Sequence, residues 1–165
     1  MANPYPDAPE SIADLVPRYE RQADELAGLI GDMTPEQVSA RPVQGRWSTL
    51  EVLAHLADSD EVLADRIKRT IAMDKPLLMG FDESLFVERL GYTRRDSADE
   101  LAILAMTRRR IARILKSLPD DAWAREAVHN ERGIVTLKQL VQMAVGHVNH
   151  HAPFIREKRK ALGLK

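Results

Sequence analysis

Three of the five histidines in this chain lie within five residues, at His147, His150 and His151. An α-helix turns by about 100° per residue, so His147 and His151 share one helix face, with His150 toward its edge. Two imidazoles at this spacing can present their nitrogens to one divalent metal ion. The alternative is a pair of hydrogen-bonded core histidines, because buried imidazoles need polar partners.

A third histidine favours the metal site. His55 borders the apolar face of an expected helix over residues 48–73, near its N-terminal end. Packing against the helix that carries His147 and His151 can bring all three to one level. Three neutral imidazoles leave a coordination position for water or substrate, as in catalytic metal sites. Because the chain has no cysteine, thiolate ligands and a cysteine nucleophile are excluded.

The elements that must position these histidines begin at capping boxes, in which a Ser or Thr and a Glu or Gln three residues later satisfy the first free amides of a helix. Four boxes and one weaker start are present: Thr34–Gln37, Ser48–Glu51, Ser97–Glu100, Thr136–Gln139 and Ser11–Asp14. Together with apolar periodicity they predict long helices over 10–31, 48–73, 97–118 and 136–161. The fold class expected is all-α, a four-helix bundle.

The connections differ in length. The stretch 74–96 is a long crossover link between the second and third long helices, and the box at Thr34 opens only a short turn. Residues 126–135 form either a turn or a small hairpin, in which His129 is expected to lie in a solvated loop.

Length and composition indicate one globular domain over residues 1–165. The formal charge of −1 gives no electrostatic reason to expect nucleic acid as a partner. Neither a signal peptide nor an apolar run of about 18 residues is evident, so we expect a cytoplasmic protein that does not bind membranes.

The opening Trp-Ser-x-x-Glu-Val-Leu-Ala-His-Leu-Ala-Asp at 47–58, combined with Gly-His-x-x-x-His at 146–151, resembles the DinB-like superfamily with its YfiT-type metal-dependent hydrolases. The resemblance extends over roughly residues 15–160. It implies a helical bundle in which His55, His147 and His151 hold a divalent metal. It also implies homodimers, and some members of the family are thiol-dependent transferases.

We therefore predict a metal-dependent enzyme acting on a small-molecule substrate. A divalent ion, zinc or nickel, would activate water for hydrolysis or a low-molecular-weight thiol for transfer. Such a thiol must be a cosubstrate, because the chain has no cysteine. The alternative is a non-catalytic metal-binding protein or a dimeric interaction protein.

Other polar residues have two interpretations each. Asp82, beside Glu83 in the long link, is either a proton acceptor in catalysis or the cap of a short helix. Asp58 either orients an imidazole or a substrate, or is a solvated helix acid, and we favour the solvated acid. At most one of Arg108–Arg110 can point inward, where it could bind an anionic substrate group, but we favour three surface arginines. Trp47 is expected to staple the entry to the second long helix.

Overall fold

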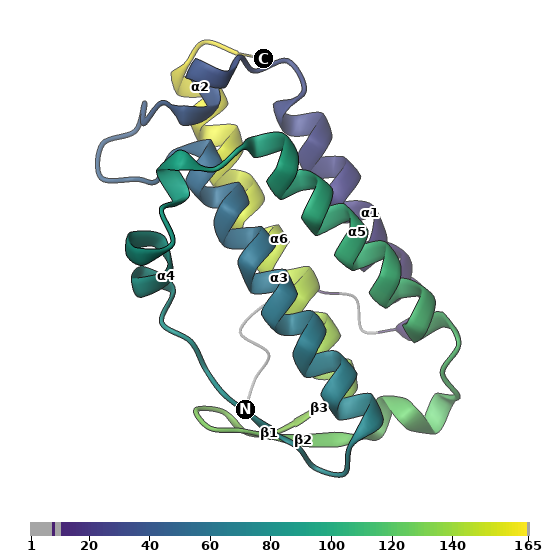
Figure 1. Ribbon diagram of the computed structural model, residues 1–165. Coiled ribbons are helices and arrows are strands. Elements are labelled where there is room, and N and C mark those ends of the chain that lie inside the picture. The colour runs from purple at the N-terminus through teal and green to yellow at the C-terminus, as the bar shows by residue number, and fades with distance from the viewer. Residues whose placement is uncertain (1–7, 9–10, 165) are drawn as a thin grey trace.

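Four long helices dominate the computed structural model, which describes residue 8 and residues 11–164 (Figure 1). Their bounds are α1 (Ile12–Ile30), α3 (Thr49–Ala72), α5 (Ser97–Lys116) and α6 (Leu137–Ala161). Each end lies within two residues of the sequence prediction, and the four-helix bundle is confirmed. The N-terminal residues on which the expectation about a signal peptide rests lie largely outside the described part of the chain.

Short elements fill the connections: α2 (Pro35–Ser39), β1 (Leu77–Leu78), α4 (Glu83–Arg89), η1 (Tyr92–Arg94), η2 (Asp120–Ala124), β2 (Glu126–His129) and β3 (Gly133–Thr136). Strands β2 and β3 form the antiparallel hairpin, and β1 from the long link adds to β2 in parallel. His129 lies in β2 and is buried, so the expectation of a solvated loop histidine was wrong. Its burial follows from strand β1, which joins the hairpin as an additional strand and which the sequence did not predict.

The expected capping boxes are formed at Thr34, Ser48 and Thr136. The box expected at Ser97 was wrong, because the Asp96 carboxylate caps α5 by accepting hydrogen bonds from the amides of Ala98 and Asp99. Aspartate caps helices as well as serine does, so a one-residue shift has little energetic cost.

The bundle has a crossed connectivity. Helices α1 and α3 each pack against both α5 and α6. In Figure 1, α3 and α5 run in the same direction while α6 runs antiparallel to α3. Two parallel neighbours need a connection that returns along the length of the bundle, which is the role of the link at 73–96. On its way, this link packs α4 and η1 against α3.

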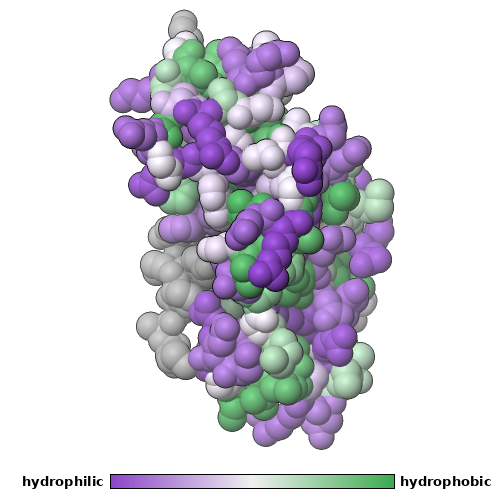
Figure 2. Space-filling view, turned by 60° about the vertical axis from the view of Figure 1, so that its left-hand side comes forward, coloured by the Kyte–Doolittle hydropathy of each residue, from purple (hydrophilic) through white to green (hydrophobic). Residues whose placement is uncertain are grey.

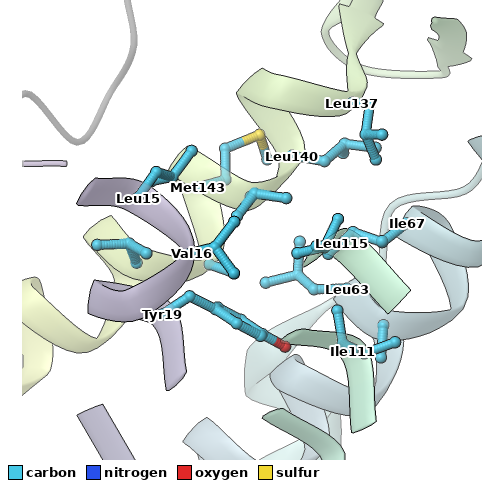
Figure 3. Close-up of a cluster of buried hydrophobic side chains, with 14 of the residues drawn as sticks. Leu15, Val16, Tyr19, Leu63, Ile67, Ile111, Leu115, Leu137, Leu140 and Met143 are labelled. Atoms are coloured by element: carbon cyan, nitrogen blue, oxygen red, sulfur yellow. The ribbon is translucent and has the colours of Figure 1, made fainter. Parts of the chain in front are cut away.

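All four long helices contribute to an apolar cluster at the end of the bundle near the sheet (Figure 3). Labelled there are Leu15, Val16 and Tyr19 of α1, Leu63 and Ile67 of α3, Ile111 and Leu115 of α5, and Leu137, Leu140 and Met143 of α6. A second cluster includes Leu53, Leu56 and Val148, which are sequence neighbours of the predicted histidine ligands. Burial of these side chains fixes α3 and α6 against each other, and with them the histidines.

One arginine of the Arg108–Arg110 run is buried in the bundle, so the expectation of three surface arginines was wrong. Arg108 forms an ion pair with Asp60 at 2.7 Å and donates to the side-chain oxygen of Gln22 at 2.6 Å. It also donates to the main-chain carbonyls of Tyr19 and Ala144, both at 3.0 Å. Arg109 and Arg110 are exposed, as expected.

The outer face of the sheet carries an exposed apolar row. Leu77, Val128 and Ile134 are exposed and lie next to each other in register across the three strands. Figure 2 shows hydrophobic surface at the lower end of the molecule, where Figure 1 places the sheet. Within the described residues, no helix is both long enough and apolar enough to cross a membrane.

Candidate metal centre

Two antiparallel helices bring three histidines together, as predicted. The box at Ser48 starts α3 so that His55 faces inward, and the box at Thr136 does the same for His147 and His151 on α6. One ring nitrogen of each histidine lies within 4.8 Å of the others, and all three residues are buried. The Nε2 atoms of His55 and His147 are 2.9 Å apart.

These residues fit a divalent metal ion. A tetrahedral ion with metal–nitrogen bonds of about 2.0–2.1 Å holds its nitrogens about 3.3 Å apart, which is within the range of this cluster. The Nδ1 atoms of His55 and His151 are buried without a hydrogen-bond partner in the described structure. Crowding partly unsatisfied imidazoles together is costly, and a metal bound by one nitrogen of each offsets that cost.

The surroundings keep the three imidazoles neutral. Burial lowers the pKa of His55 to about 4 and that of His151 to about 3. Burial, and then the neighbouring His151 and His55, hold the pKa of His147 well below its usual value. Neutral imidazoles are the form that binds metal, so the site needs no deprotonation near neutral pH.

Aromatic residues surround the cluster. The Trp47 ring lies 5.3 Å from the His55 ring and packs against the second apolar cluster, in keeping with the structural role expected for it. His150 is exposed, and its ring contacts those of His151 and Phe154 from the rim.

The acidic residues of the long link have different positions. Glu83, in the first turn of α4, places its Oε2 atom 3.9 Å from Nε2 of His55, with the side chain 56% exposed. The Asp82 carboxylate accepts hydrogen bonds from the amides of Ser84 at 2.9 Å and Leu85 at 3.1 Å, so it caps α4. The cap at Asp82 fixes the first turn of α4, in which Glu83 lies.

Asp58 is neither solvated nor bonded to an imidazole, so the favoured expectation for it was wrong. Its carboxylate pairs with Arg95 at 2.7 Å and accepts a hydrogen bond from the Tyr92 hydroxyl at 2.8 Å. Asp58 therefore ties the end of the long link to α3, one turn beyond His55.

A cavity of about 90 Å³ opens beside His147. Its lining comes from α3, the long link, the β2–β3 turn and α6: Ser59, Leu63, Arg66, Gly80, Phe81, Glu83, His129, Glu131, Arg132, Met143 and His147. Sequence reasoning missed most of these residues. Only Ser59 carries a usable signal, because it lies four positions after His55 on the same helix face.

The fold and the site define a class: helical bundles built around a buried three-histidine cluster that fits a divalent metal. The sequence profile of the DinB superfamily matches residues 18–155, and the chain belongs to that superfamily.

Relatives cover most of the chain. The protein named "Putative metal-dependent hydrolase YfiT" of Bacillus subtilis is 28% identical over 153 residues, which are 92% of this chain and 83% of that protein. OB0782 of Oceanobacillus iheyensis, with the same descriptive name, is 26% identical over 79% of this chain and 75% of its own. The solved structure of YfiT, described as having an unusual four-helix bundle topology, superposes with a TM-score of 0.87. It is 25% identical, and the match covers 97% of this chain and 94% of that one.

Proposed function

We propose that this chain is a metal-dependent hydrolase of small molecules, with one divalent ion held by His55, His147 and His151. The observation that carries the proposal is the convergence of three buried ring nitrogens within 4.8 Å, supplied by two different helices. The relatives named metal-dependent hydrolases support the reaction class.

The chemistry follows from the ligand set. An ion on His55, His147 and His151 would supply a Lewis acid that activates water for attack. The chain itself must then take the proton from the attacking water. We assign this role to Glu83, because its Oε2 atom lies 3.9 Å from Nε2 of His55 and its side chain is open to solvent.

Asp82 has a supporting role in this proposal. Its carboxylate accepts hydrogen bonds from the amides of Ser84 and Leu85 in the first turn of α4, which sets the position of Glu83. The alternative is that Asp82 itself is the proton acceptor.

Zinc and nickel are the ions we propose, since imidazole ligands suit both. A low-molecular-weight thiol in place of water would turn the same site into a transferase. We favour hydrolysis because that is the activity in the names of the relatives.

Metal content per chain tests the ligand assignment. Protein purified without an affinity tag should carry about one zinc or nickel ion per chain, and His147→Ala should carry almost none. His150→Ala is the matched control, because His150 lies three positions away on the same helix but is exposed. Elemental analysis that found full metal content in His147→Ala would overturn the assignment.

The role of Glu83 is tested by activity. On ester and amide substrates, Glu83→Gln should lower kcat by about 100-fold, the scale of general-base catalysis, while metal content stays unchanged. Asp82→Asn should have a smaller effect, because an asparagine side chain can still cap α4. Full activity in Glu83→Gln with a large loss in Asp82→Asn would assign the base to Asp82. Turnover that required an added thiol would establish transfer in place of hydrolysis.

A further inference from the structure

The cavity beside His147 continues from the histidine cluster along α3 toward the sheet. Ser59 and Arg66 lie on its α3 wall, four and eleven positions after His55. At 1.5 Å of rise per residue, they are about 6 Å and about 16 Å from His55 along the helix axis. The cavity is therefore a polar extension of the metal centre.

Its walls contain hydrogen-bonding atoms without partners. Within the described structure, five buried side-chain polar atoms have no hydrogen-bond partner. Two of them, Ser59 Oγ and Arg66 Nε, belong to residues lining this cavity, and two more are the Nδ1 atoms of His55 and His151. A folded protein rarely leaves such groups unsatisfied, so the two on the cavity wall, Ser59 Oγ and Arg66 Nε, point to a ligand.

Two arginines in the lining lack carboxylate partners. Arg66 is only 7% exposed and donates from Nη2 to the main-chain carbonyl of Met79. Arg132, in the turn between β2 and β3, is partly exposed. Throughout the described residues, neither guanidinium has a carboxylate within salt-bridge distance. A buried guanidinium without an ion-pair partner is costly, and its planar donors suit carboxylate and phosphate oxygens.

Among the other charges on the lining, Glu131 offsets the charge of Arg66 only in part: burial lowers the pKa of Arg66, and Glu131 raises it without forming an ion pair. Glu83 faces His55 at the opposite end of the cavity. Glu131 is exposed, and its carboxylate lies against Gly80. It occupies the space that the Cβ atom of any larger residue at position 80 would need. Glu131 is thus a repulsive charge for any anion that reaches the arginines.

We propose that this cavity binds an anionic group of the substrate, a carboxylate or a phosphate, through Arg66, Arg132 and the hydroxyl of Ser59. The volume of about 90 Å³ fits such a group with few additional atoms. The bond to be hydrolysed then lies toward the histidines. Only this last step rests on the proposed function, and anion binding by the arginines does not.

The test is a calorimetric titration of the metal-loaded protein at constant ionic strength. One titration uses inorganic phosphate and a separate one uses acetate. Arg132→Gln removes one charge-assisted contact. It should lower the affinity for whichever of the two anions binds more tightly by about tenfold. Glu131→Gln should tighten it, because a repelling charge is lost. Arg69→Gln is the matched control, since Arg69 is an exposed arginine of α3 outside the lining.

Elemental analysis of every variant separates this inference from the proposed function. The anion site would be overturned, and the metal site would stand, if all variants kept full metal content and bound the anion equally well. The proteins to compare are the wild type, Arg132→Gln and Arg66→Lys. If metal is absent but anion binding still depends on the arginines, the metal site would be overturned and the anion site would stand. Tighter binding of phosphate would assign a phosphorylated substrate, and tighter binding of acetate would assign a carboxylate.

Discussion

At the scale of single residues, Asp60 and Arg108 form an ion pair buried inside the bundle. Burial raises the pKa of Asp60, although Arg108 opposes this, and both side chains are at most 3% exposed. Arg108 of α5 also donates to carbonyls of α1 and α6, so one guanidinium ties α1, α3 and α6 to α5. The charge is tolerated because every side of it is hydrogen-bonded.

Asp60→Asn should therefore lower the free energy of unfolding by roughly 3–5 kcal/mol, because it leaves the Arg108 charge buried without a carboxylate. Urea denaturation followed by circular dichroism measures this. Asp65→Asn, on the same helix, removes an exposed pair with Arg69 and should cost less than about 1 kcal/mol. Equal losses in the two variants would contradict the role of the buried pair.

At the scale of elements, the start of α3 depends on Glu51. Its carboxylate accepts from the Ser48 amide at 2.8 Å, which closes the capping box, and it pairs with Arg41 from the preceding loop. Burial raises the pKa of Glu51, but the hydrogen bonds from Arg41 and Ser48 outweigh it and leave the pKa below the usual 4.5. Four residues later the same helix presents His55.

Glu51→Gln keeps a capping side chain and removes the charge, so at neutral pH it should destabilise the fold by about 1 kcal/mol. Because the folded-state pKa lies below the unfolded one, the contribution of Glu51 is present above pH 4.5 and is lost as pH falls through the folded pKa. Urea denaturation of both proteins between about pH 7 and about pH 3 should show the difference shrinking. A difference independent of pH would mean that packing, and not charge, is responsible.

At the scale of the whole molecule, metal binding should couple to unfolding, because the cluster joins α3 to α6 and exists only when both are in place. A ligand that binds only the folded state at a thousandfold excess over its Kd stabilises by about 4 kcal/mol. Chelation should then lower the Tm of the wild type by roughly 10 °C. The Tm of His147→Ala should not respond to chelator, and an equal shift in both would contradict the assigned ligands.

The homodimer implied by the family resemblance stays a prediction, which light scattering checks through a mass twice that of one chain.

The helices and the histidines could be predicted because their signals are local. Caps and apolar periodicity predicted the bounds of α3 and α6. Periodicity alone indicated that His147 and His151 face the core. The rest depends on contacts between distant segments. Two residues of β1 pair with a strand some fifty positions later, and Arg108 finds Asp60 on another helix. The cavity draws its lining from α3, the link, the hairpin and α6, an arrangement that no local pattern records.

The division of the cavity between helices and link has an evolutionary consequence. The histidines lie on the two helices α3 and α6, whereas much of the cavity wall beyond them comes from the link and the β2–β3 turn. Loops accept substitutions, insertions and deletions more readily than packed helices do. New substrate preferences can therefore arise by drift in these two segments while the three histidines are inherited unchanged. Grafting the 73–96 link and the 126–136 hairpin from one relative onto the helices of another is the corresponding route to engineered specificity.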